Sequence, residues 1–332
     1  MPAPLLHIDR LSLNIPTDEG VAEILSDVSI ALNRGESIGV VGESGCGKSM
    51  TALAVMGLLP EAAQATGAIR FDGDDLLQAG EAALCALRGR RIAMIFQEPM
   101  TALNPVMCIG AQVAEGLRLH LHLGRAEAED QARRLLDRVG LPAPRFSPRL
   151  YPPQLSGGQR QRVVIAMALA CGPDILIADE PTTALDVTIQ AQILDLIAAV
   201  TAETGMALIM ISHDLGIVAE TTERMLVMYA GRIVEQGPTA EVFARLAHPY
   251  TRGLFAASPH AVAASGDQGG RVRLAAIPGQ VPDPHRRPRG CVFADRCARA
   301  TEACRAGVPA PVAIGTNHTA ACIHPVLDEV PV

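Results

Sequence analysis

The chain has 332 residues, of which 49% are hydrophobic and 19% are charged, and its formal net charge is -7. This composition is typical of a folded globular protein and excludes a disordered chain. The acidic balance argues against nucleic acid as the main partner, because phosphate backbones are bound through basic surfaces.

No membrane-directed segment is visible. The N-terminal stretch MPAPLLHIDRLSLNI lacks a basic segment followed by an apolar one, so we expect no secretory signal. The longest apolar region, residues 163–178, is shorter than a membrane span and contains Gly172, Pro173 and Asp174. We therefore expect a cytoplasmic chain with one large domain and a smaller one.

A glycine-rich turn is predicted between a strand and a helix near the N-terminus. The β-branched stretch 36–42 indicates a buried strand, and the pattern of 49–59 indicates a helix that stops at Pro60. Between them GESGCGKS matches G-x-x-x-x-G-K-S, in which backbone N–H groups and a helix N-terminus bind phosphate. Lys48 would supply a charge to the outer phosphates, and Ser49 a hydroxyl to Mg²⁺. The predicted phosphate-binding residues are Gly42, Glu43, Ser44, Gly45, Cys46, Gly47, Lys48 and Ser49.

Lys48 is the only lysine among the 28 lysines and arginines of the chain. Arginine is planar and forked, whereas the ammonium of lysine is a compact point charge. This usage indicates a small space in which arginine does not fit.

The middle of the chain is predicted to be helical. Apolar residues at helical spacing predict helices at 111–123 and 126–141, the second ending at Gly140 before a proline-rich link. The segment LSGGQRQR follows at 155–162. Its residues Ser156, Gly157 and Gly158 would cap the next helix and leave its first N–H groups free for an anion.

A second buried strand, within 174–181, ends in two carboxylates, Asp179 and Glu180. Adjacent acids after a strand are most often a solvated turn. Beside a phosphate loop, however, the first would hold Mg²⁺ and the second could orient or deprotonate the attacking water.

Taken in order, these motifs resemble those of the nucleotide-binding subunit of ABC transporters over nearly the whole chain. The same order includes Gln97 in IFQEP, Asp186 at the end of ALD, and His213 in ISHD after the strand MALIMI. The resemblance implies an α/β P-loop NTPase with a RecA-like core, an antiparallel β subdomain and a helical signature subdomain at about 100–165.

The resemblance also implies a mechanism in which two cassettes stack head to tail and enclose ATP. Glu180 would be the catalytic base, His213 would contact the γ-phosphate, and Gln97 would touch the metal and report to the membrane subunit. Magnesium would be held by Ser49, Gln97 and Asp179. The ATP of the partner subunit would be contacted by Ser156, Gly157, Gly158, Gln159 and Asp186.

The chain departs from the family at the adenine. ABC cassettes usually stack the base on an aromatic residue near the end of the first strand, and residues 11–30 contain none. Ile15 is the nearest match, so we expect apolar contact with the base there.

The C-terminal part resembles that of the oligopeptide and dipeptide uptake ATPases, with the D-type subunit of the dipeptide subfamily as the nearest match. PMTALNP at 99–105 and DEPTTALDVTIQAQI at 179–193 fit the same subfamily. We expect a nucleotide-binding domain at 1–257 and a C-terminal domain at 258–332, with a weakly structured segment at 261–273.

Four cysteines of this C-terminal domain, Cys291, Cys297, Cys304 and Cys322, indicate a metal site rather than two disulfides in a reducing cytoplasm. Four thiolates suit zinc or an iron–sulfur cluster, and the absence of C-x-x-C pairs favours iron. The resemblance implies a [4Fe-4S] cluster. Zinc and four free thiols stay open as alternatives, and so does a structural or a redox role.

These features predict the ATPase of a di- or oligopeptide importer, peripheral on the cytoplasmic face of the inner membrane. Its expected partners are a second ATPase subunit in a heterodimer, two permeases and, through them, a periplasmic or extracellular peptide-binding protein. A groove near Gln97 would receive a permease helix. The alternatives are a soluble ABC ATPase acting on ribosomes or DNA, and the same importer type carrying nickel or glutathione.

Overall fold

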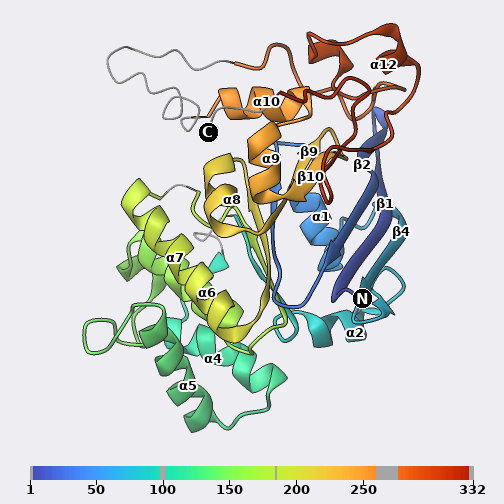
Figure 1. Ribbon diagram of the computed structural model, residues 1–332. Helices are drawn as coiled ribbons and strands as arrows, with labels where there is room; N and C mark the ends of the chain where they lie inside the picture. The colour runs from blue at the N-terminus through green and yellow to red at the C-terminus, as the bar shows by residue number, and fades with distance from the viewer. Residues whose placement is uncertain (1–2, 98–101, 184, 259–275, 329–332) are drawn as a thin grey trace, which may run out of the picture. The chain divides into compact units, whose positions relative to one another are not determined.

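The computed structural model of the protein describes residues 3–97, 102–183, 185–258 and 276–328 (Figure 1). The chain forms two compact units. The first unit comprises Met1–Leu32, Ser37–Gln78 and Met210–Val332, and the second comprises Asn33–Glu36 and Ala79–Ile209. The segment expected to be weakly structured, 261–273, and residues 99–101 of PMTALNP lie outside the described residues.

An antiparallel sheet in the first unit has the strand order β2, β1, β4, β5, of which Figure 1 labels the first three. Its strands are β1 (Leu6–Thr17), β2 (Gly20–Leu32), β4 (Gln64–Phe71) and β5 (Asp74–Asp75). Strands β1 and β2 form a hairpin in which Thr17 pairs with Gly20. A bulge at Arg10, whose φ is 47°, breaks the alternation so that both Ile8 and Leu11 are buried. The expected antiparallel β subdomain is therefore confirmed.

The described part of the first unit also contains strands of a mixed sheet, in the order β11, β12, β10, β9, β3. These are β3 (Ser37–Val41), β9 (Arg224–Tyr229), β10 (Arg232–Pro238), β11 (Val312–Ala313) and β12 (Thr319–Ala320). Strand β3 is parallel to β9, whereas β10 is antiparallel to β9 and to β12. Because β12 follows the third of the four clustered cysteines, the C-terminal region extends the sheet that contains the strand before the phosphate loop.

The first unit also contains helices, two of which, α8 (Leu215–Thr221) and α9 (Thr239–Arg245), pack against this sheet. The others are α1 (Lys48–Val55), α10 (Pro249–Ala256), α12 (Glu302–Ala306) and a 3₁₀ turn at Ala294–Arg296. One apolar cluster joins Val41 of β3 and Tyr229 of β9 to Tyr250 of α10 and to Phe293. The C-terminal region thus shares its core with the strand that leads into the phosphate loop.

Helix α1 ends earlier than the sequence predicts. The expected helix 49–59 begins at Lys48 and stops at Val55, well before Pro60. Gly57 adopts φ 62°, and its N–H bonds to the carbonyl of Ala54 at 3.1 Å while the N–H of Leu58 bonds to that of Leu53 at 2.8 Å. This Schellman arrangement satisfies the last carbonyls and terminates the helix.

The second unit combines short parallel strands with helices. Its strands are β6 (Ile92–Ile95) and β7 (Ile175–Asp179), which pair in parallel, and β8 (Ala207–Ser212) begins in this unit and ends in the first. Its helices are α2 (Glu81–Leu87), α4 (Ile109–His120), α5 (Arg125–Arg138), α6 (Gly157–Leu169), α7 (Val187–Thr204) and a 3₁₀ turn at Pro152–Gln154.

Helices α4, α5 and α6 pack against one another within the second unit (Figure 1). The two helices predicted at 111–123 and 126–141 are confirmed as α4 and α5, with ends that differ by one to three residues. Within the described ranges, no helix combines the length and apolarity that crossing a membrane requires.

Gly39 in the middle of β3 allows α8 to lie directly on the strand. A Cβ at this position would come within 2.2 Å of Cγ1 of Val218 and 2.9 Å of Oγ1 of Thr222.

We expect Gly39→Ala to lower the free energy of unfolding by about 2 kcal/mol through overpacking, as measured by urea denaturation. Gly80→Ala is the control, because a Cβ at Gly80 meets nothing within 4 Å, and equal stability of the two variants would contradict the prediction.

Candidate nucleotide-binding site

The phosphate loop is a turn that only glycine permits at three points. Gly42, Gly45 and Gly47 have φ values of 155°, 77° and 106°. A Cβ on Gly42 would lie 2.2 Å from the carbonyl oxygen of Met228, and one on Gly47 would lie 2.5 Å from Cδ2 of Leu25. The loop therefore packs closely against other residues of the first unit. Its glycine conformations allow several backbone N–H groups to point toward one place at the start of α1.

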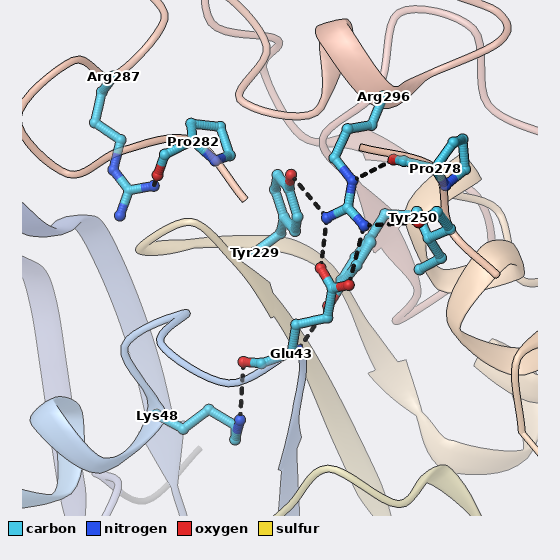
Figure 2. A network of polar contacts seen from close by, with 9 residues as sticks. Glu43, Lys48, Tyr229, Tyr250, Pro278, Pro282, Arg287 and Arg296 are labelled. Atoms are coloured by element: carbon cyan, nitrogen blue, oxygen red, sulfur yellow. Dashed lines mark hydrogen bonds and ion pairs between the residues drawn. The ribbon is translucent and has the colours of Figure 1, made fainter. Parts of the chain in front are cut away.

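Lys48 lies inside this turn. Its side chain is buried, and Nζ donates to the carbonyl oxygens of Gly42 at 2.7 Å and Glu43 at 3.2 Å, the second of which Figure 2 shows. The Sγ of Cys46 is 3.9 Å from Nζ. Burial raises the pKa of the Cys46 thiol, so it stays protonated and places no negative charge beside the ammonium.

Glu43 takes part in this loop in a way that the sequence does not indicate. Its carboxylate forms an ion pair with Arg296, and its backbone N–H donates to the hydroxyl of Tyr250 at 2.8 Å (Figure 2). Both partners lie more than 200 positions away in the chain. No local pattern around GESGCGKS could have revealed them.

In the second unit, several polar residues meet at the end of β7. Asp179, the last residue of the strand, is buried, and Glu180 follows it with an unusual φ of 46°. The Glu180 carboxylate accepts hydrogen bonds from Nε2 of Gln97 at 3.1 Å and from the hydroxyl of Thr183 at 3.0 Å. The structure thus brings together Gln97 and Glu180, which are 83 residues apart, and holds the carboxylate in one orientation.

The segment LSGGQ begins helix α6 as predicted. Ser156 is the N-cap, its hydroxyl accepts from the N–H of Gln159 at 3.4 Å, and Oε1 of Gln159 accepts from the N–H of Ser156 at 2.9 Å. A Cβ on Gly158 would lie 2.5 Å from Cγ2 of Ile189, so this glycine allows close packing against α7. Asp186 caps α7 by accepting from the N–H of Ile189 at 3.0 Å.

Gln161 is a residue of this segment that sequence reasoning missed. It is buried, and its Nε2 donates to the carbonyl of Pro181 at 2.7 Å. This bond links α6 to the turn that carries Glu180. The sequence around Gln161 indicates neither its burial nor its partner.

The remaining predicted residues lie in the first unit. His213 is exposed after β8, next to Asp214, which caps α8 by accepting from the N–H of Gly216 at 2.8 Å. Ile15 is half-buried in β1, opposite Ala22 of β2.

The four C-terminal cysteines line one cavity of about 10 Å³, together with His248 and His324. All four are free thiols, so they form no disulfides. However, among the residues that the structure describes, no group of three or more Cys, His, Asp or Glu is arranged to hold a metal ion. The expected metal site is therefore not supported. Burial raises the pKa of Cys322 to about 11 and raises that of Cys291, so both thiols are neutral when no metal is bound.

None of the three histidines near the cysteines, His248, His318 and His324, is placed as a ligand. His318 is fully buried, and its Nε2 lies 2.8 Å from Oε1 of Glu235. His324 contacts the hydroxyl of Thr301 at 3.0 Å. Burial lowers the pKa of His248 to about 4, so the neutral ring accepts a hydrogen bond from the N–H of Tyr250 at 3.1 Å.

Comparison with known proteins decides the family. Residues 25–183 match the model of the ABC transporter family, and residues 234–304 match that of the oligopeptide/dipeptide transporter C-terminal region. A putative peptide import ATP-binding protein of Brucella abortus (strain 2308) is 48% identical over 327 residues, which cover 96% of this chain and 97% of that protein. The chain belongs to the ABC transporter family. It is an ATPase cassette, as the order of its motifs predicted.

Two further proteins are similar to the cassette. A probable peptide ABC transporter ATP-binding protein of Sinorhizobium fredii (strain NBRC 101917 / NGR234) is 48% identical over 96% of this chain and 94% of its own length. Among solved structures, a dimeric ATP-binding cassette in a post-hydrolysis state with ADP and Pi aligns with a TM-score of 0.61 and 26% identity, over 70% of this chain and 98% of that one. The cassette fold and its P-loop NTPase class are thereby confirmed.

Replacement of Lys48 tests the phosphate loop. We expect Lys48→Met to lower kcat/KM for ATP by about 100-fold, because a positioned charge at the transferring phosphate is lost. Lys48→Arg should be as impaired, since the guanidinium does not fit between the carbonyls of Gly42 and Glu43. Steady-state phosphate release measures both.

The control is Arg138→Met, which removes a cation that pairs with exposed Glu203 in the second unit. It should leave turnover unchanged. Full activity of Lys48→Met, or of Lys48→Arg, would contradict the assignment.

Proposed function

We propose that this cassette hydrolyses ATP to drive the import of di- or oligopeptides through a membrane permease. The observation that carries the proposal is that residues 234–304 match the C-terminal region of oligopeptide/dipeptide transporters. Strands β11 and β12, which follow the matched residues, continue the sheet of the nucleotide-binding cassette. The relatives from Brucella and Sinorhizobium are described as peptide import or peptide transporter proteins. This match to a transporter region argues against a soluble cassette that acts on ribosomes or DNA.

In the proposed reaction the phosphate loop binds the nucleotide. N–H groups of Gly45 to Ser49 surround the phosphates, and Lys48 compensates the charge of the outer ones. Ile15 supplies apolar contact to the adenine. Magnesium prefers oxygen ligands, and the Ser49 hydroxyl, the Gln97 amide oxygen and the Asp179 carboxylate offer them.

Glu180 acts as the base that orients or deprotonates the attacking water. Its carboxylate is fixed by Gln97 and Thr183, which limits its rotation and favours one direction of attack. His213 contacts the γ-phosphate in this proposal. Because Gln97 binds Glu180 directly, movement of Gln97 by a permease helix docking near it would change the position of the base.

Two cassettes enclose each ATP. Ser156, Gly157, Gly158, Gln159 and Asp186 contact the nucleotide on the partner, to which the capped N-terminus of α6 presents a positive dipole. The partners are a second ATPase subunit, two permeases and, through them, a peptide-binding protein. The cassette works on the cytoplasmic face of the inner membrane, with its nucleotide-binding domain in 1–257 and its transporter-specific domain in 258–332.

Glu180→Gln tests the catalytic part of the proposal. The amide keeps its size but cannot accept a proton, so we expect hydrolysis to fall at least 100-fold while ATP binding and ATP-dependent dimerisation persist. Phosphate release and size-exclusion chromatography with ATP measure the two effects. Glu203→Gln, which changes an exposed carboxylate of the same unit, should behave as the unaltered chain. Unchanged hydrolysis by Glu180→Gln would remove Glu180 from the mechanism.

The substrate class is tested in membrane vesicles or proteoliposomes that contain the permeases encoded with this chain. Uptake of a labelled dipeptide should depend on ATP and on Glu180. Uptake of nickel or glutathione but not of peptides, or isolation of the chain with ribosomes or DNA in place of permeases, would contradict the proposal.

We further propose that Cys291, Cys297, Cys304 and Cys322 ligate a [4Fe-4S] cluster. Four sulfur donors suit iron–sulfur chemistry, and all four line one cavity. The cavity of about 10 Å³ has room for about one water, so binding requires the segments that carry the thiols to separate and the thiols to lose their protons.

Analysis of the full chain purified without oxygen tests this assignment. We expect about four iron and four sulfide per chain, with broad visible absorbance that Cys297→Ser abolishes. Cys85→Ser, which changes an exposed thiol of the second unit, should leave the iron content unchanged. Stoichiometric zinc, or no bound metal at all, would refute the cluster.

A further inference from the structure

Glu43 of the phosphate loop is held by an arginine from the C-terminal region. Nη1 of Arg296 donates to Oε2 of Glu43 at 2.6 Å, and Nη2 donates to Oε1 at 3.0 Å (Figure 2). The side chain of Arg296 is 5% exposed and that of Glu43 28%. Two parallel, charge-assisted hydrogen bonds of this kind fix the orientation of the carboxylate.

Arg296 is itself fixed in place. Its remaining hydrogen bonds go to the carbonyl oxygens of Pro278 at 2.8 Å and Ile277 at 3.2 Å, and to the hydroxyl of Tyr229 at 3.2 Å. The guanidinium also lies 5.7 Å from the ring centre of Tyr229 and 5.9 Å from that of Phe293. A guanidinium has five N–H donors, and these bonds with the two to Glu43 use all of them. Such a group is a rigid anchor rather than a surface charge.

The backbone of Glu43 is held from the same side. Its N–H donates to the hydroxyl of Tyr250 at 2.8 Å, and the Tyr250 ring packs 4.6 Å from that of Tyr229 and 5.4 Å from that of Phe293. The side chain and the N–H of Glu43 are thus both bound by residues outside the nucleotide-binding motifs. The carbonyl of the same residue accepts from Nζ of Lys48 at 3.2 Å.

We propose that Arg296 is a positioning residue for ATP binding. It fixes Glu43, and Glu43 in turn fixes the turn whose carbonyls hold the ammonium of Lys48. The C-terminal region therefore determines the geometry of the phosphate loop, in addition to any role in transport. This inference rests on the proposed binding of ATP by that loop.

The test is the KM for ATP and the dissociation constant of a fluorescent ATP analogue for the full chain. We expect Arg296→Met to raise both about tenfold, equivalent to about 1.4 kcal/mol, with kcat changed less than threefold. Glu43→Gln should have a similar effect, and Arg296→Met should add little in the Glu43→Gln background, because both changes break the same contact. Arg296→Lys keeps the charge but not the forked pair of donors, so its KM should lie between those of Arg296→Met and the unaltered chain.

Arg287→Met is the matched control. Arg287 is a half-buried arginine of the same region that donates to the carbonyls of Pro282 at 2.8 Å and Glu23 at 3.3 Å rather than to the phosphate loop. It should leave KM unchanged, even if it lowers the melting temperature. A KM for Arg296→Met and Glu43→Gln within twofold of the unaltered chain overturns the inference, and so does an equal rise for Arg287→Met. Failure of the unaltered chain to bind the analogue would instead count against the proposed function.

Discussion

The structure depends on one buried ammonium group. Nζ of Lys48 lies between the carbonyls of Gly42 and Glu43, inside a turn whose glycines have backbone angles that other residues avoid. Burying a charge is costly unless polar groups surround it, and here the loop itself supplies them. The neutral thiol of Cys46 does not cancel the charge, which stays available to a phosphate. The single lysine of the chain is thus explained by the space that it occupies.

The surroundings of this turn extend far along the chain. Strand β3 leads into it, β9 supplies Met228 against Gly42, and Tyr250 and Arg296 hold Glu43. Tyr229, Tyr250 and Phe293 form the aromatic part of one core, although Phe293 belongs to the C-terminal region. In physical terms the C-terminal region is not an appendage, because its removal would expose this core and release Glu43.

The sequence predicted most of the motif-bearing elements. The strand, glycine turn and helix around Lys48, the cap at Ser156, and helices α4 and α5 follow from local rules on propensity, capping and periodicity, and all are present. The predicted end of α1 was wrong, because Gly57 adopts a left-handed conformation that terminates the helix before Pro60. Roles within the site, such as those of Glu180 and His213, came from motif order and stay predictions.

What the sequence could not predict are contacts over long distances. The Glu43–Arg296 pair joins residues 253 positions apart, and the bond from Gln161 to Pro181 depends on how α6 packs. For the cysteines, by contrast, the sequence predicted a site that the structure does not support. Their number and clustering indicate ligands, but the described thiols lie around a small cavity without the arrangement of a metal site. Composition can identify donor atoms, whereas their geometry depends on packing and on what is bound.

In the proposed reaction the turn around Lys48 binds the terminal phosphates of a nucleotide. Amide hydrogen exchange over Gly42–Ser49 of the full chain tests it most directly, with Mg²⁺ and either ATP or adenosine. We expect strong protection of the amides of Gly45 to Ser49 by ATP and none by adenosine, because only ATP carries the phosphates. Exchange that is the same with ATP, with adenosine and without ligand would contradict it.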